Sequence, residues 1–205
     1  MTMDTNDAQD FPLCPLLAKR YSPRAFADKK IEKEKLRRIF EAARWSASCS
    51  NEQPWRFIVG IQGADDTFER ILRVLTESNQ RWARNAPVLM LVCAATTFAI
   101  SGKTNKWHMY DAGQAAVHLT IQAMYEGIYL HQMAGFDAEK ARVEFSIPPD
   151  VVPASAIAMG YPGEADTLPE DLRQRELQPR TRKPINEMLF SGSWGNPSDI
   201  IRPIS

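Results

Sequence analysis

Residues 42–59, AARWSASCSNEQPWRFIV, read as the end of an amphipathic helix, a turn of small polar residues and a strand that begins at Arg56. Polar side chains and free backbone donors gather where two such elements meet, so a ligand can bind there. The same residue types build ordinary helix-to-strand loops, and the turn alone leaves both interpretations equally open. The side chains that can hydrogen-bond a planar heterocycle are Ser48, Ser50, Asn51 and Gln53.

The flanks of this turn predict core elements. Upstream, residues 31–45 place apolar side chains at helical spacing opposite a basic face, which predicts a helix that packs on the core. Downstream, the apolar run 88–94 follows Pro87 and is typical of a strand buried on both faces in the middle of a sheet. The remaining predicted elements are strands at 56–61 and 154–159 and helices at 67–75, 110–127 and 138–145.

The composition is that of an ordinary soluble globular chain of one domain, with 205 residues, 44% hydrophobic and 24% charged. Lys plus Arg and Asp plus Glu each number 25, so no overall charge favours nucleic acid or a membrane surface, and any anion site must be local. No apolar run reaches the roughly eighteen residues of a membrane span. Residues 1–10 are polar and acidic, unlike a secretory signal, and we expect a cytoplasmic protein.

The cysteines and histidines do not predict a metal site. Cys14, Cys49 and Cys93 are odd in number, far apart and without CxxC spacing, which argues against a disulfide framework and against zinc. This fits a reducing compartment. His108 and His118 have no second ligand at metal spacing, so we interpret them as structural or exposed.

Residues 19–26, KRYSPRAF, predict an extended segment, because Pro23 fixes its own φ and biases Ser22 away from helix. In such a segment Arg20, Ser22 and Arg24 share a face. Two guanidinium groups with a hydroxyl between them could hold a phosphate. A solvated basic edge is the alternative, and the segment by itself favours it.

A second small-residue turn, within residues 128–137, leads into the helix at 138–145 with Asp137 as the expected N-cap. Its exposed backbone N–H groups could point at an electron-rich ring nitrogen. His131 lies close by, and we interpret it as satisfied packing more readily than as a ligand contact. Asn79 reads as a cap or turn residue, and Trp82 either stacks on a heterocycle or belongs to the core.

Helix 110–127 carries a stripe of small side chains that lets another element approach closely. The sequence allows two interpretations of this stripe, packing in the core or contact with a second subunit. The stripe consists of Ala112, Ala115, Ala116, Leu119 and Ala123.

Residues 47–57, ASCSNEQPWRF, resemble the Pro-Ser-Ser-x-Asn-x-Gln-Pro-Trp-x-Phe signature of the FMN-dependent nitroreductase family, with Ala47 and Cys49 in place of the Pro and the second Ser. Further similarities follow in the family's order from residue 20 to residue 190. They are Arg20-x-Ser22-x-Arg24, Asn79 before the buried strand, Met133-Ala134-Gly135, Gly160-Tyr161-Pro162 and Arg180-x-Arg182-x-Pro184. Trp82 departs from the pattern, because relatives carry a Lys there.

The resemblance implies an α+β fold with a mixed sheet flanked by helices, and a homodimer with two FMN sites at the subunit interface. It implies that arginines grip the FMN phosphate and that the 133–135 turn covers one face of the ring and donates a backbone hydrogen bond near N5. Glycine-rich dinucleotide and phosphate loops are missing from the sequence. The residues implied to bind FMN are Arg20, Tyr21, Ser22, Arg24, Ser48, Cys49, Ser50, Asn51, Gln53, Asn79, Met133, Ala134, Gly135, Arg180 and Arg182.

The function implied is an oxidoreductase that transfers hydride from NADH or NADPH to a nitroaromatic, a quinone or a similar electron-poor acceptor by a ping-pong mechanism. The flavin carries out the chemistry, so no catalytic side chain is expected. A reductive dehalogenase or specialised dehydrogenase of the same fold, and a flavin-binding module without turnover, are the alternatives. We expect no nucleic-acid or membrane partner, a flexible leader at 1–12, the FMN-binding domain at 13–190 and a C-terminal tail at 191–205.

Overall fold

The structure is a computed structural model that describes residues 12–201. Apart from Pro12, the leader predicted at 1–12 lies outside the described residues. The described chain forms a compact unit, Leu13–Leu177, and residues from Gln178 onward belong to a second unit, which is treated by itself. No helix in the described part of the chain is long and apolar enough to cross a membrane.

An antiparallel sheet of four strands, in the order β1-β2-β4-β3, is the frame of the compact unit. The strands are β1 (Trp55–Ile61), β2 (Val88–Ala95), β3 (Tyr129–Met133) and β4 (Val151–Gly160). β2 pairs with β1 and β4, and its side chains are buried on both faces from Val88 to Ala94. The expected central strand is therefore confirmed. Among the described strands the sheet is antiparallel rather than mixed, which corrects that part of the predicted fold.

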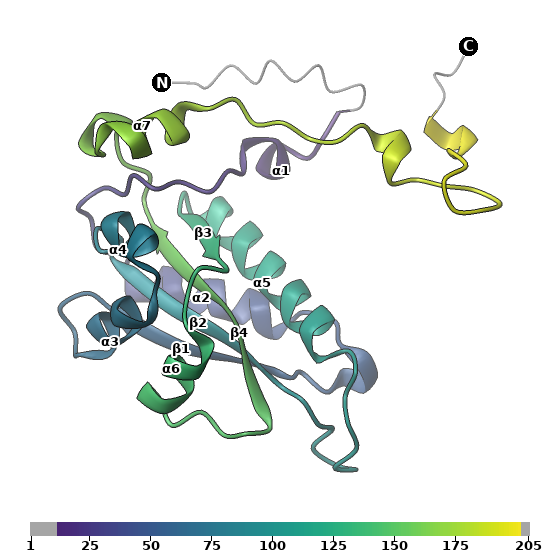
Figure 1. The fold of residues 1–205 in the computed structure, drawn as a ribbon, viewed down its shortest axis with the longest axis horizontal. Coiled ribbons are helices and arrows are strands. Elements are labelled where there is room, and N and C mark those ends of the chain that lie inside the picture. The colour runs from purple at the N-terminus through teal and green to yellow at the C-terminus, as the bar shows by residue number, and fades with distance from the viewer. Residues whose placement is uncertain (1–11, 202–205) are drawn as a thin grey trace. The chain divides into compact units, whose positions relative to one another are not determined.

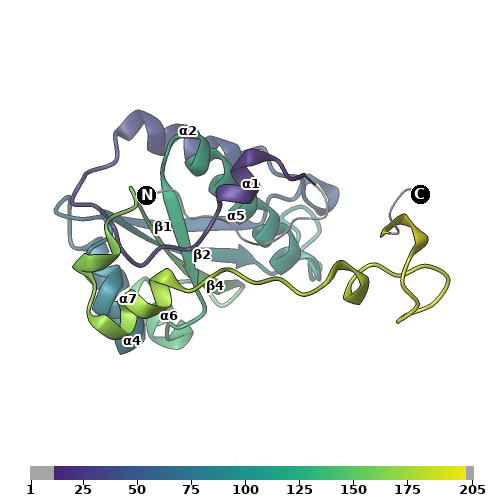
Figure 2. The same cartoon turned by 90° about the horizontal axis from the view of Figure 1, so that it is seen from above.

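Helices cover both faces of this sheet. One core joins α2 (Lys33–Arg44) and α5 (His108–Tyr125) to one face of β2 and β4. The other core joins the opposite face to α3 (Thr67–Val74), α4 (Glu77–Ala83), α6 (Ala138–Glu144) and α7 (Glu170–Leu177). Figure 1 shows the sheet between these helices, and Figure 2 shows α2 and α5 on one side of it and α4 and α6 on the other. The short helix α1 (Pro15–Lys19) contacts α5.

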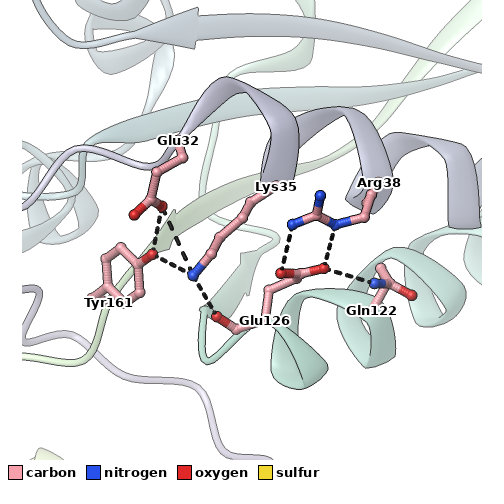
Figure 3. A network of polar contacts seen from close by, with 6 residues as sticks. All are labelled: Glu32, Lys35, Arg38, Gln122, Glu126 and Tyr161. Carbon is pink, nitrogen blue, oxygen red and sulfur yellow. Dashed lines mark hydrogen bonds and ion pairs between the residues drawn. The ribbon is translucent and has the colours of Figure 1, made fainter.

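A polar network fixes α2 against the end of α5 (Figure 3). Lys35 donates to the Glu126 carbonyl at 3.2 Å and to the Tyr161 hydroxyl at 2.9 Å. The Tyr161 hydroxyl in turn donates to Glu32 at 2.6 Å, and this hydrogen bond holds the pKa of Glu32 below its ordinary value. Arg38 forms two hydrogen bonds with the Glu126 carboxylate. The network therefore ties α2, α5 and the end of β4 together.

Most of the predicted elements are confirmed, with shifts of a few residues at their ends. The sequence analysis did not predict α1, α4 or α7, nor β3, which lies within the stretch interpreted as a turn. β3 is an edge strand of five residues. Its adjacent polar residues His131 and Gln132 interrupt the alternation of apolar and polar residues that would predict a strand. α4 is polar except for Trp82 and Ala83, and the burial of these two side chains holds it on the core.

The small-residue stripe of α5 is part of the core of its own chain. All five side chains are at most 4% exposed. This corrects the idea that the stripe forms a subunit contact, because α2 and the sheet already cover it. The opposite face of α5 exposes Tyr110, Val117 and Tyr125.

The second unit, described by itself, contains two short 3₁₀ helices, Ile185–Glu187 and Asp199–Ile201. An isolated bridge pairs Phe190 with Pro197, and the rings of Phe190 and Trp194 lie 5.1 Å apart. Most of its large side chains are exposed, and Trp194 is 92% exposed. The unit has no extensive core of its own among these residues.

Gly60 and Gly113 make a matched pair for testing the packing. A Cβ at Gly60 on β1 would lie 2.5 Å from the backbone of Phe68, whereas one at Gly113 on α5 would meet no atom within 4 Å. We expect Gly60→Ala to lower the free energy of unfolding by about 2–3 kcal/mol, because backbone cannot yield as a side chain does. Gly113→Ala should raise it by roughly 0.5–1 kcal/mol through helix propensity. Urea unfolding measures both, and equal effects would contradict this packing of β1 on α3.

Candidate functional site

The first group of predicted ligands lies in the segment that follows α1. The chain is extended at Arg20, and the Arg20 guanidinium donates to the Ser22 hydroxyl at 3.4 Å, so the expected pairing of these side chains is confirmed. The Tyr21 ring lies 5.1 Å from the ring of Tyr129 on β3. Burial, with a smaller contribution from the charge of Glu176, raises the pKa of Tyr21 to about 12, so its hydroxyl stays protonated at neutral pH.

Arg24 does not simply join this pair. Its guanidinium lies 3.9 Å from the Glu176 carboxylate on α7, and its backbone N–H donates to the same carboxylate at 2.8 Å. Glu176 is only 8% exposed, and burial raises the pKa of its carboxyl. Arg24 thus already has an anionic partner within the chain, which alternation along the segment did not predict.

His131 holds the same segment from the other side. Its Nδ1 lies 3.0 Å from the Pro23 carbonyl oxygen, and its ring packs 4.4 Å from the ring of Trp82. Trp82 is 2% exposed and also stacks on Phe26, so it is a core residue in this structure. Burial lowers the pKa of His131 to about 4. The imidazole is therefore neutral at physiological pH.

The 133–135 turn contacts the start of α4. Asn79 Nδ2 donates to the Gly135 carbonyl at 2.9 Å, and the Thr76 backbone N–H donates to the same oxygen at 3.0 Å. A Cβ at Gly135 would lie 2.6 Å from Asn79 Nδ2 and 2.9 Å from Thr76 Oγ1, so a larger residue would displace these two side chains. The hydrogen bonds of residues 12–201 include no acceptor for the Gly135 N–H. Asp137 caps α6 by accepting from the Lys140 N–H, as predicted.

The loop between α2 and β1 is held by its own side chains. The Ser48 hydroxyl accepts from the Gln53 N–H at 3.0 Å, and Gln53 Nε2 donates to the carbonyl and side-chain oxygens of Asn51. Ser50, Asn51 and Gln53 have φ near +53° to +55°, a left-handed conformation that is uncommon outside glycine. The hydrogen bonds within the loop hold these residues in the strained conformation.

Two buried side chains at the start of α5 were not predicted as site residues. The Asp111 carboxylate on α5 is 2% exposed and accepts from the Cys49 N–H at 3.1 Å. Asn105 is fully buried, and its side-chain oxygen accepts from the Trp107 N–H at the start of α5. The sequence did hold a signal for Asp111, because an acidic residue directly precedes the apolar stripe of α5. Asp111 fixes the loop to the first turn of α5.

The sheet register separates these groups. Trp55, next to the loop, pairs with Ala94 at one end of β1 and β2, whereas Tyr129, beside the Arg20 segment, pairs with Gly160 at the other end of the sheet. β1 and β3 are also opposite edges. The anchoring positions are thus about 20 Å apart along the strands and about 14 Å apart across them. Within one chain, the loop and the Arg20 segment are at different corners.

The remaining predictions concern basic residues and metal ligands. Arg180 and Arg182 lie in the second unit, so their convergence with Arg20 stays a prediction. In that unit Arg182 donates to the neighbouring Thr181 carbonyl at 2.6 Å. His118 is exposed, and His108 Nδ1 lies 2.7 Å from the Asn105 carbonyl oxygen, as their structural interpretation required. Residues 12–201 contain no group of His, Cys, Asp and Glu side chains that could hold a metal.

Sequence comparison identifies relatives of this chain. The nitroreductase family profile matches residues 17–78. A protein of Methanothermobacter thermautotrophicus named "Putative NADH dehydrogenase/NAD(P)H nitroreductase" is 30% identical over 152 residues, which cover 71% of this chain and 74% of that protein. The chain belongs to the nitroreductase family. An uncharacterized 15.4 kDa protein of Mycolicibacterium smegmatis is 37% identical over 149 residues, 69% of this chain and 99% of the relative.

Solved structures agree with this membership of the nitroreductase family. A crystal structure described as an oxidoreductase containing FMN superposes with a TM-score of 0.88 at 35% identity, covering 96% of this chain and 100% of that one. A nitroreductase family protein of Clostridium difficile gives a TM-score of 0.68 at 28% identity, covering 87% and 96%. The α+β class predicted from the sequence is confirmed.

The low pKa of His131 predicts a pH-dependent contribution to stability. The unfolded chain protonates His131 near its ordinary pKa of 6.5 and the folded chain near about 4. The contribution is therefore complete above pH 6.5 and is lost as the pH falls toward 4. Between pH 7 and pH 5 we expect wild type to lose about 1–2 kcal/mol more unfolding free energy than His131→Asn. Parallel urea titrations measure this difference, and identical pH dependence of the two proteins would contradict it.

Proposed function

We propose that this nitroreductase family member binds FMN and is an oxidoreductase that transfers hydride from NADH or NADPH to nitroaromatic, quinone or similar electron-poor acceptors. The observation that carries the proposal is the gathering of three predicted ligand groups along one edge of the sheet. The Arg20–Ser22 pair lies beside β3, the Gly135 turn follows β3, and Asn79 bonds to that turn. The names of the relatives support the same cofactor and donor.

The donor set of this edge fits FMN chemically. A guanidinium and a hydroxyl match phosphate oxygens, and a backbone N–H without a partner in the described chain matches a ring nitrogen. Gly135 lets the turn lie close against Asn79 and Thr76, and this contact fixes the position of its backbone N–H. Arg24 and Arg182 stay in the proposal as further phosphate partners, Arg24 with Glu176 beside it.

Bound FMN would supply the hydride chemistry, accepting from the nicotinamide and donating to the acceptor. The chain's own residues would bind the FMN and polarise its ring. Arg20 would offset charge on the phosphate, Ser22 would hydrogen-bond to it, Asn79 fixes the turn, and the Gly135 N–H would donate where negative charge develops. With the turn behind one face of the ring, donor and acceptor would use the opposite face in succession, and the kinetics would be ping-pong.

The proposal includes a homodimer. The Ser48–Gln53 loop and the Arg20 segment are at different corners of one chain, so a site that uses both takes the loop from a second copy. The outer face of α5 is the proposed contact, because it exposes large side chains at positions 110, 117 and 125, which lie on one side of the helix. The tail at 191–205 is a second proposed contact.

Reduction of the bound flavin tests the function directly. The purified protein, loaded with FMN under anaerobic conditions, should lose its flavin absorbance when NADH or NADPH is added, and a nitroaromatic or quinone should restore it. Stopped-flow absorbance with each nicotinamide and a panel of acceptors measures both half-reactions. A flavin-loaded protein that neither nicotinamide reduces would contradict the oxidoreductase and favour a binding module.

Arg20→Ala tests the phosphate assignment. Loss of one charge-assisted partner of the phosphate should weaken FMN binding by about ten- to a hundredfold. Arg37→Ala removes the same charge from an exposed ion pair with Glu34 on α2 and is the matched control, which should bind FMN like wild type. Fluorescence titration of the apoproteins measures the affinity. Wild-type affinity in Arg20→Ala would show that this guanidinium does not contact the phosphate.

A further inference from the structure

His131 is a half-buried polar side chain to which the proposed chemistry assigns no part. It lies on β3, two residues before Met133, and its ring is packed between Trp82 and the segment that contains Arg20 and Ser22. The polar atom that it presents to this segment is Nδ1, which lies 3.0 Å from the Pro23 carbonyl oxygen.

The contact with Pro23 settles the tautomer. A backbone carbonyl can only accept, so at 3.0 Å from the Pro23 oxygen the His131 Nδ1 must carry the proton. The neutral ring, which burial favours, still donates from Nδ1 when its other nitrogen is unprotonated. The bond is therefore present throughout the neutral pH range.

The hydrogen bond to Pro23 helps to hold the backbone of the segment in place. Pro23 has no N–H, and its carbonyl accepts a hydrogen bond from His131 on β3. On the next residue, the Arg24 N–H donates to Glu176 at 2.8 Å. The backbone is thus held by a donor from β3 and an acceptor from α7, and the side chains of Arg20 and Ser22 are set by that backbone.

From this geometry we infer that His131 is a positioning residue for phosphate recognition: its Nδ1–H fixes the Pro23 carbonyl and thereby couples the Arg20–Ser22 pair to the strand that ends at the 133–135 turn. The inference rests on the proposed FMN site and deepens it. His131 sets the separation between the phosphate end and the ring end of that site. It touches neither the cofactor nor a substrate.

The comparison of FMN with riboflavin isolates this role, because riboflavin lacks the phosphate. We expect His131→Leu to weaken FMN binding about tenfold and to leave riboflavin binding unchanged within about twofold, as loss of one positioning hydrogen bond allows. His131→Asn places an amide donor near the position of Nδ1 and should restore the wild-type ratio of the two affinities. Gln132→Leu changes the exposed neighbour on β3 and is the control.

Fluorescence titrations of the apoproteins with both flavins, together with apoprotein melting curves, decide between the outcomes. Equal weakening of FMN and riboflavin in His131→Leu, or no weakening of either, would overturn the inference. Should His131→Leu not fold, His131→Gln replaces it, because its donor lies one bond farther out; equal ratios in the Asn and Gln variants would then overturn it. A wild type that binds neither flavin would refute the proposed function itself, and the inference with it.

Discussion

The fold depends on the burial of β2 on both faces. From Val88 to Ala94 every side chain is buried, so each face of the sheet must be covered by helices and each edge of β2 must be paired. β1 and β4 form hydrogen bonds with the backbone of β2 on its two edges. Helices α2 and α5 cover one face of the sheet, and α3, α4 and α6 cover the other. Polar residues are then left to the ends and edges of the sheet, and the predicted ligands described in the compact unit lie there, except Asn79, which is on α4 and bonds to the turn after β3.

Periodicity predicted the parts of this frame that are long or strongly apolar. The spacing of Leu36 and Ile39 and the apolar run of β2 follow from local sequence alone. β3 and α4 could not be found this way, because β3 is a short edge strand with polar members and α4 depends on the burial of Trp82. The mixed sheet was expected only from the family resemblance. The pairing of the four described strands shows an antiparallel sheet instead.

The candidate site was predictable where it depends on local geometry. Alternation along an extended chain placed Arg20 with Ser22, and capping chemistry identified Asp137. The supports behind these residues were not predictable. Glu176 lies 152 positions from Arg24 in sequence, and His131 lies 108 positions from Pro23. Such pairs arise only after the sheet and its helices have packed, and no local pattern encodes them.

The register of the sheet leads to the central claim, that one FMN site uses the Arg20 segment of one copy and the Ser48–Gln53 loop of another. Subunit complementation tests it most directly. Arg20→Ala and Asn51→Gly, which keeps the left-handed backbone at position 51, are each expected to bind FMN weakly. When the two are refolded together at equal amounts, half of the dimers are mixed, and one site in each is intact. The account predicts recovery of about a quarter of the wild-type FMN sites. Mixed dimers, verified by native mass spectrometry, that recover no FMN binding would contradict it.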